Sequence, residues 1–213
     1  TLMAPTFHGI LTSPSITLND QTITDIRGMV DYEDSVVSVS QFGFRQGGGS
    51  YQAALSINVD THDADGTIKV QDGDINAITA IGNFKNDIVT GKLSSDIQVG
   101  GTYDNPELTV IGRLDAGKIS GYDVHDVNIN LHLLDHVIYI DKLMGQQGTD
   151  GSFEVGGTVT IGGPIAAHFS AQKLALGMFT KSAGLERKVH GTADIEAAFG
   201  GTTGNPSADV TIA

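Results

Sequence analysis

Apolar and polar residues alternate along most of this 213-residue chain. In the segment DVNINLHL, the apolar residues Val127, Ile129, Leu131 and Leu133 stand at every second position. The segments SYQAALSINVD and GSFEVGGTVTI alternate in the same way. Because successive side chains of a β-strand point to opposite faces of a sheet, this period of two predicts strands that are buried on one face. Asp-Gly, Gly-Gly and Asn-Pro pairs interrupt the alternation about every eight to twelve residues, which is typical of turns.

Two segments depart from the alternation. They read GDINAITAIGNFK, at residues 73–85, and AQKLALGMFTKSAGLERK, at residues 171–188. Their apolar residues have mixed spacing, which favours a short helix in each segment. We expect these helices near residues 74–81 and 174–181.

The turn sequence GGTYDNPELTV, at residues 100–110, recurs as GGTTGNPSADV at residues 200–210. Matches at nearly the same offset occur elsewhere, since the Asp-Ile pair that begins at Asp25 corresponds to the Asp-Val pair that begins at Asp126. A fixed period of about 100 residues is typical of structural units that stack on one another. The Asn-Pro turn would then mark the point at which each unit begins again.

The repeat predicts one continuous β segment rather than separate domains. We expect this segment to cover residues 1–213, with copies at approximately 1–99, 100–199 and 200–213, the last being the start of a third. We also expect the chain to be a segment of a longer protein. The predicted fold class is all-β: an elongated, curved sheet of repeated units with an apolar groove and one or two short helices.

Composition excludes several classes of partner. The net charge is −13, and Lys and Arg residues are scattered singly except for the pair at residues 187–188. Without a basic stripe, neither nucleic acid nor an anionic membrane surface is an expected partner. The chain contains no Cys, so disulfides and thiolate chemistry are excluded. The sequence contains no apolar run of about 18 residues, the length that a membrane-spanning helix requires.

The segment HLLDH resembles an inverted zinc-binding motif. His132 and His136 are four residues apart, and this spacing binds zinc only on a helix, where both side chains share a face. Here the segment follows one predicted strand and precedes another, so we interpret it as a polar hairpin turn without a metal.

The segment THDADGTIKVQD, at residues 61–72, imitates a calcium loop. Its first position is Thr61 rather than Asp, and its last is Asp72 rather than a bidentate Glu. We interpret it as an Asp-Gly hairpin between two strands. The Gly-rich segment RQGGGS, at residues 45–50, lacks the Lys and the helix of a phosphate-binding loop, and we interpret it as a strand connection. We therefore predict a non-enzymatic protein with no catalytic residues, no metal and no cofactor.

The order of these motifs over residues 100–164 resembles the repeat of the family of the translocation and assembly module subunit TamB and its AsmA-like relatives. In that repeat, Gly-Thr and Asn/Ser-Pro precede a Gly-x-Leu strand, and a Gly-containing turn, an Asp-Val strand, an Ile-x-Ile strand and a Gly-rich loop follow. The matching residues are Gly101, Thr102, Asn105, Pro106, Gly112, Leu114, Ile119, Gly121, Asp126, Val127, Leu131, Ile138, Ile140, Gly148, Gly151, Gly157 and Val159.

The resemblance implies a protein of the periplasm of diderm bacteria, whose full-length form is anchored in the inner membrane. It also implies a long curved sheet, a β-taco, with an apolar groove. Such proteins are implicated in lipid transport between the inner and outer membranes, and in outer-membrane biogenesis and protein secretion. The partners it implies are phospholipid acyl chains and, through the full-length protein, an outer-membrane barrel protein of the TamA/BamA type.

A sheet with apolar stripes must bury one face, either by closing into a sandwich or by curling around an apolar body. The scarcity of aromatic residues, 6% of the chain, favours an aliphatic groove suited to acyl chains. If about eighteen strands cross it at about 4.8 Å each, the groove is about 85 Å long. The residues predicted to line it are Ile26, Val30, Val37, Val39, Val127, Ile129, Leu131, Ile138, Ile140, Phe153 and Val155.

Two other classes of function are compatible with this sequence. Adhesin-like surface repeats that bind a protein or a glycan are also acidic, free of Cys and rich in Gly and Thr. They usually form closed sandwiches, so access of solvent or lipid to the apolar stripe distinguishes the two readings. A β-helix lyase or hydrolase acting on glycans is the third candidate, although no two carboxylates stand out as a catalytic pair.

Overall fold

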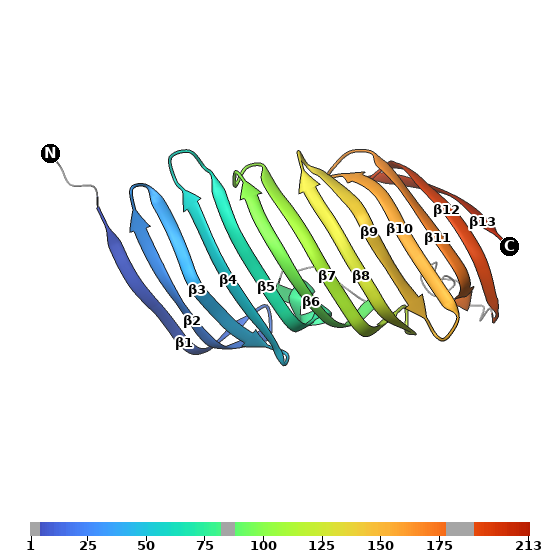
Figure 1. Ribbon diagram of the computed structural model, residues 1–213, viewed down its shortest axis with the longest axis horizontal. Helices are drawn as coiled ribbons and strands as arrows, with labels where there is room; N and C mark the ends of the chain where they lie inside the picture. The colour runs from blue at the N-terminus through green and yellow to red at the C-terminus, as the bar shows by residue number, and fades with distance from the viewer. Residues whose placement is uncertain (1–4, 82–87, 178–189) are drawn as a thin grey trace.

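The computed structural model describes residues 5–81, 88–177 and 190–213, which form one antiparallel sheet of thirteen strands and one short helix (Figure 1). The elements are β1 (Phe7–Leu18), β2 (Gln21–Glu33), β3 (Val36–Gln46), β4 (Gly49–Asn58), β5 (Ala64–Asp74), α1 (Ile75–Ile81), β6 (Val89–Gly101), β7 (Pro106–Ile119), β8 (Tyr122–Leu134), β9 (Val137–Gln147), β10 (Gly151–Thr160), β11 (Ile165–Ala175), β12 (Thr192–Thr202) and β13 (Asn205–Ile212). The all-β class predicted from the alternation is confirmed.

Each strand pairs with the strands before and after it in the chain, so the sheet is a simple meander. The sheet is open, with β1 and β13 as its two edges, and it curves along its length (Figure 1). Twelve inter-strand spacings of about 4.8 Å give it a width of about 58 Å. The expected eighteen strands and 85 Å are therefore too many and too long for the described residues.

The excess arose because several turn-forming residues lie inside long strands. Gly156 and Gly157 belong to β10, and Asp65 and Gly66 belong to β5. The hairpin predicted at residues 61–72 exists, but its turn lies at residues 59–63 rather than at the Asp-Gly pair. The Asn58 side chain holds this turn, because its Oδ1 atom accepts hydrogen bonds from the backbone N–H groups of residues 60 and 61 at 2.9 and 3.0 Å.

The two helix predictions differ in outcome. The first is confirmed, since α1 follows Asp74, whose Oδ1 atom accepts hydrogen bonds from the backbone N–H groups of Asn76 and Ala77 at 2.9 and 3.2 Å and thereby caps the helix. The second is wrong at its start, because Leu174 lies in β11, where its side chain is completely buried, and the described chain becomes helical only at Gly177. Residues 178–181 of that prediction lie outside the described residues.

Polar residues with positive φ angles change the alternation within five of the described strands. Asp25, Gln41, Asp72, Asp126 and Lys173 have φ angles between 50° and 55°. The pairing register shifts at each of these positions, as in a β-bulge. One extra residue then separates two inward side chains, so that Val124 and Val127, for example, are both buried.

The two rims of the sheet differ in structure. We call one the helix rim: it consists of α1 and the turns at residues 19–20, 47–48, 120–121 and 148–150. Figure 1 shows α1 at the lower rim. The opposite rim, here called the hairpin rim, consists of the turns at residues 34–35, 59–63, 102–105, 135–136, 161–164 and 203–204. The largest cluster of buried residues comprises Leu114, Val124, Val127, Phe153, Ala171, Leu174, Ala193 and Ile195.

Candidate functional site

One face of the sheet is apolar across nearly its whole width, and we call it the apolar face. Cross-strand pairing aligns its side chains into rows that run from strand to strand. One such row, from β3 to β13, is Phe44, Tyr51, Val70, Ser95, Gly112, Ile129, Leu143, Val155, Phe169, Ala197 and Val210. A second, from β2 to β11, is Val30, Val39, Leu55, Gly66, Val99, Leu108, Leu133, Ile138, Val159 and Ile165.

The opposite face is polar, and we call it the polar face. Between the two apolar rows, residues of the other parity form the cross-strand row Gln52, Lys69, Asp96, Ile111, Asn130 and Lys142. All but one of them are polar or charged. The sheet therefore separates an apolar from a polar surface, as the period of two predicts.

All eleven residues predicted to line a groove lie on the apolar face. Four of them, at positions 26, 30, 37 and 39, belong to β2 and β3, and the other seven belong to β8, β9 and β10. The structure brings the members of each group together, as in the pairs Ile129–Leu143 and Leu131–Ile140. It separates the two groups by four strands, β4 to β7.

A cavity of about 510 Å³ lies on the apolar face beside α1. Its lining is Ile75, Ile78, Thr79, Val89, Leu93, Leu114, Ile119, Val127, Ile129, Leu143, Phe153, Val155 and Phe169. Four of the residues predicted from the sequence are among them, at positions 127, 129, 153 and 155. Sequence reasoning missed the contribution of α1, because the spacing within a seven-residue helix does not reveal which sheet residues it faces.

Thr79 is the only polar side chain in the lining of this cavity. Its Oγ1 atom donates to the carbonyl oxygens of Ile75 and Asn76 within α1, at 2.9 and 3.1 Å. The hydroxyl is therefore satisfied inside the helix. The cavity can therefore bind an apolar group, and no polar atom of its lining requires a hydrogen bond from a ligand.

Two buried polar atoms beneath α1 have no hydrogen-bond partner among the described residues. Gln46 is 3% exposed, and its Oε1 atom is unpaired although its Nε2 atom donates to the carbonyl oxygen of Ala77 at 3.4 Å. Tyr51 is 7% exposed and its hydroxyl is unpaired. Burial, and after it the negative charge of Asp74, raises the pKa of Tyr51, so this hydroxyl stays protonated at neutral pH.

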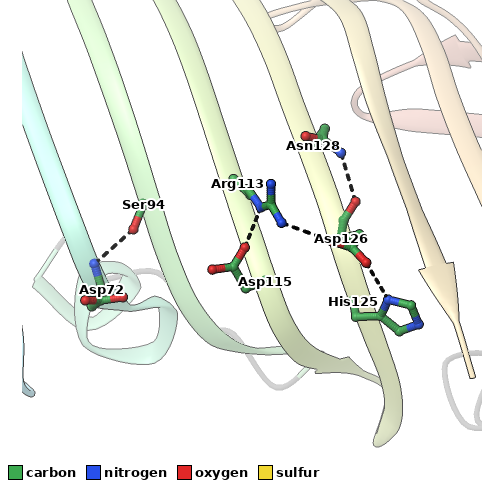
Figure 2. A network of polar contacts seen from close by, with 7 residues as sticks. All are labelled: Asp72, Ser94, Arg113, Asp115, His125, Asp126 and Asn128. Atoms are coloured by element: carbon green, nitrogen blue, oxygen red, sulfur yellow. Dashed lines mark hydrogen bonds and ion pairs between the residues drawn. The ribbon is translucent and has the colours of Figure 1, made fainter.

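A polar network holds β7 and β8 together on the polar face near the helix rim (Figure 2). The guanidinium of Arg113 contacts Asp115, and its Nη2 atom is 3.1 Å from Oδ1 of Asp126. The Oδ2 atom of Asp126 lies 2.9 Å from Nδ1 of His125, whose Nε2 atom lies 2.9 Å from the carbonyl oxygen of Gly148. These groups are exposed, and the network secures the bulge at Asp126.

The same contacts shift two pKa values. The hydrogen bond to the Gly148 carbonyl, followed by that to Asp126, raises the pKa of His125. The hydrogen bond from His125 is the main cause that lowers the pKa of Asp126. Both shifts favour the charged forms, because each hydrogen bond is strongest when His125 carries its second proton.

A larger hollow of about 990 Å³ lies over β1 to β6 and is bordered by residues of the polar face. Its walls include Gln52, Lys69 and Asp96, and the Lys69 Nζ atom is 3.4 Å from Oδ1 of Asp96. Apolar side chains, among them Ile10, Met29 and Phe42, line it together with exposed amides, one surface ion pair and the backbone at Gly28 and Gly43. These groups form no convergent set of reactive side chains.

The two metal-like motifs take part in ordinary hairpins. The turn predicted at HLLDH is confirmed, with residues 135–136 between β8 and β9. His132 lies 2.7 Å from Oδ2 of Asp141 through its Nδ1 atom and stacks on Tyr139 with ring centroids 4.3 Å apart. Within the described parts of the chain, no group of three or more His, Cys, Asp or Glu side chains is arranged to hold a metal ion. The RQGGGS segment forms the β3–β4 connection, as predicted.

Among the described residues, no helix combines the length and the hydrophobicity that crossing a membrane requires. Comparisons of the chain with protein-family models, curated proteins and solved structures find no match.

Proposed function

We propose that this protein binds the acyl chains of phospholipids along its apolar face. The observation that carries the proposal is the unbroken apolar rows, which extend over ten or more strands with Ser95 as the only polar member other than the Tyr51 hydroxyl. Apart from α1, the residues that the structure describes place no covering layer on this surface. Apolar surface of this extent requires an apolar partner, and aliphatic side chains suit alkyl chains because neither makes directional polar contacts.

The proposal includes a groove formed by stacked repeats. Backbone features that recur at about the predicted offset support the repeat. Asp25 and Asp126 have φ angles of 55° and 51°, and the glycines at positions 101 and 201 have φ angles of 77° and 76°. The first pair coincides with corresponding register shifts in β2 and β8. Stacked units with equal bulges would align their apolar stripes into one track.

At the level of the cell, we propose a non-enzymatic scaffold that conducts phospholipid between the inner and outer membranes. The full-length protein would be anchored in the inner membrane, cross the periplasm, and meet an outer-membrane barrel protein of the TamA/BamA type. This part rests on the family resemblance of residues 100–164. The sheet width of about 58 Å means that this segment alone would form only part of such a bridge.

Site-specific photo-crosslinking in cells tests the proposal. A photoreactive side chain at position 129 or 131 should capture phospholipid, because both positions lie on the apolar face. The same group at position 130 is the matched control, since Asn130 lies on the polar face between Ile111 and Lys142. Equal capture at positions 129 and 130, or no capture in a folded protein, would refute the proposal and favour a binding module of the adhesin type.

A charge on the apolar face provides a second test. Replacement Ile129→Asp should abolish lipid capture, because Ile129 is partly buried and a carboxylate covered by a bound acyl chain costs several kcal/mol unless it is neutralised. Replacement Asn130→Asp introduces the same side chain on the polar face and should leave lipid capture unchanged. Native mass spectrometry of the two variants measures the bound lipid directly.

A further inference from the structure

We propose an orientation for the lipid: its acyl chain lies along the strands, with the methyl end in the cavity beside α1 and the headgroup at the hairpin rim. We propose further that this rim selects headgroups that carry an ammonium group over anionic ones. The inference rests on the proposed function, because it assigns the orientation and the class of lipid at that same face.

The cavity beside α1 suits the methyl end of a chain and not a headgroup. Its lining is apolar except for Thr79, whose hydroxyl is bonded within the helix. A phosphate or glycerol group placed there would lose its hydrogen bonds to water and gain none from the protein. An alkyl chain makes no hydrogen bonds to water that it could lose, and it gains apolar contact with the cavity lining.

In β8 and β11, the most deeply buried apolar side chains lie toward the helix rim. Leu174 and Val124, at that end, are buried. Val59 and Ile161, at the hairpin rim, are 45% and 55% exposed. In this part of the sheet, a molecule that is apolar at one end and hydrated at the other therefore fits best with its apolar end toward the helix rim.

The length of the apolar face fits one chain. From Val127, in the cavity, to Leu133, beside the hairpin rim, β8 rises six residues, which at about 3.3 Å each is about 20 Å. A bilayer core about 30 Å thick contains two leaflets, so a single chain spans about 15 Å. A chain that begins in the cavity thus ends within about 5 Å of Leu133, so its headgroup lies toward the hairpin rim.

The hairpin rim carries negative charge and no lysine or arginine. Its turns and the residues flanking them contain Glu33, Asp34, Asp60, Asp63, Asp104 and Asp135, with His62 and His136 beside them. All eight residues lie within the described part of the chain. A headgroup with an ammonium group complements these carboxylates, whereas a headgroup with net negative charge is repelled.

The absence of Trp from the chain allows a direct test of orientation. A single Trp is introduced either by Phe169→Trp, in the cavity lining, or by Ile161→Trp, at the hairpin rim of the same β10–β11 hairpin. Phosphatidylcholine with a nitroxide near the chain methyl should quench the Trp at position 169 more strongly. Phosphatidylcholine with a nitroxide on the headgroup should quench the Trp at position 161 more strongly. Equal quenching or the reverse order overturns the orientation.

Competition between two lipids tests the headgroup. The full chain is mixed with phosphatidylethanolamine and phosphatidylglycerol of the same acyl composition in equal amounts, and the bound fraction is analysed. In 50 mM salt, phosphatidylethanolamine should be enriched about five-fold, the ratio that about 1 kcal/mol for one close ion pair in water gives. The enrichment should disappear in 1 M salt, where charges are screened beyond about 3 Å.

Variants locate the source of this selectivity. Replacing the aspartates at positions 34, 60, 104 and 135 by Asn should reduce the enrichment to about one-fold, because each replacement keeps the shape and removes the charge. The matched control replaces four aspartates elsewhere, at positions 20, 72, 115 and 123, and should keep the enrichment. Loss of selectivity in both variants, or bound lipid without any preference, overturns the headgroup assignment alone. Absence of any bound lipid overturns the proposed function as well.

Discussion

Two regions of the apolar face, β3–β5 and β9–β11, have equivalent strand pairing but differ in where they place large and small side chains. Phe44 pairs with Tyr51 in the first region, and Gly145 pairs with Phe153 at the equivalent positions of the second. In β3–β5, the ring of Phe44 stacks on Tyr51, with centroids 4.6 Å apart, and Gly73 leaves room for the tyrosine. A Cβ atom at Gly73 would come within 2.8 Å of the Tyr51 hydroxyl. In β9–β11, the aromatic ring is that of Phe153. Gly145 leaves room for this ring, since a Cβ atom at Gly145 would lie 2.7 Å from it.

A second pair of equivalent positions shows the opposite difference in size. Leu174 occupies in β11 the position that Gly73 occupies in β5. Each residue directly follows the bulge residue of its strand, which is Lys173 in β11 and Asp72 in β5. A large and a small residue have thus traded places between the two regions while the strands keep their register. A side chain that is large in one region is therefore matched by a small one at the equivalent position of the other, and a neighbouring position makes the opposite exchange.

The two regions also differ in how their buried polar atoms are satisfied. The Oε1 atom of Gln147, in β9, accepts a hydrogen bond from the backbone N–H of Ala175 at 2.7 Å. The corresponding Oε1 atom of Gln46, in β3, has no partner among the described residues. Together with the position of the main buried cluster, this difference predicts that the β9–β11 region is the more stable of the two.

The largest effect should follow from Leu174→Ala. Its side chain is completely buried within the main cluster, so we expect the free energy of unfolding to fall by about 2–5 kcal/mol through lost burial and an unfilled cavity. Urea denaturation measures the change. Leu134→Ala, at the exposed hairpin rim, is the matched control, and a similar loss there would mean that burial does not distinguish the two positions.

Gly145→Ala should be the next largest. The new methyl group would lie 2.7 Å from Phe153 and 2.8 Å from Val127, and such overpacking costs about 1–3 kcal/mol. Gly100→Ala is the control, because no atom lies within 4 Å of a Cβ there. Adding Phe153→Leu to the Gly145→Ala variant should recover part of the loss, and purely additive effects would show that the glycine does not make room for the ring.

A smaller effect of opposite sign should come from Tyr51→Phe. It removes a buried hydroxyl that has no partner, so we expect stabilisation by about 1 kcal/mol. The reverse change at the corresponding position, Phe153→Tyr, should be destabilising, because Leu174 fills the space that Gly73 leaves for the hydroxyl. A destabilised Tyr51→Phe variant would show that this hydroxyl has a partner in the folded protein.

The smallest effect concerns pH, since β8 carries His125 where β2 carries Thr24. A raised His pKa adds stability that is fully present below about 6.5, the unfolded value, and is lost as pH rises through the folded value. NMR titration should therefore place the midpoint of His125 above the ordinary value. Replacement Asp126→Asn should lower the midpoint, and an unchanged midpoint would contradict the contact between the two side chains.

The lowered pKa of Asp126 has the opposite consequence. Its contribution to stability is present above the unfolded value of about 3.9 and is lost as pH falls through the folded value. Between these two limits, in mildly acidic solution, the contact should be strongest. Both side chains remain in contact with solvent, with 36% and 52% of their surface exposed, so the effect will be confined to the local network.

Much of the fold follows from the sequence, because a period of two depends only on the geometry of the extended chain. The stripe from Val127 to Leu133 and the helix after Asp74 were both predictable in this way. The bulges at Asp25 and Asp126 were not, because a positive φ angle at Asp depends on pairing with the next strand. Leu174 was assigned to a helix for the same reason: the bulge at Lys173 gives the apolar spacing a helical appearance.

The candidate site was predictable only in part. Alternation identifies which residues share a face, so the eleven predicted lining residues all lie together on one side of the sheet. Alternation does not identify how deeply each residue is buried. Burial of the cavity lining depends on Ile75 and Ile78, and therefore on where a short helix packs against the sheet. The pairing of Phe153 with Gly145 is likewise a tertiary fit between strands, and neither residue indicates it alone.

The meander has a consequence for how the molecule responds to tension. Every strand pairs only with its neighbours in the chain, as in the β1–β2 hairpin that closes at Leu18 and Gln21. Contacts are therefore local for a β-protein, which favours rapid folding from any hairpin outward. A pull on the two ends would load the edge ladders one hydrogen bond at a time. The sheet would then peel open strand by strand at low force and, on release, close again along the same path.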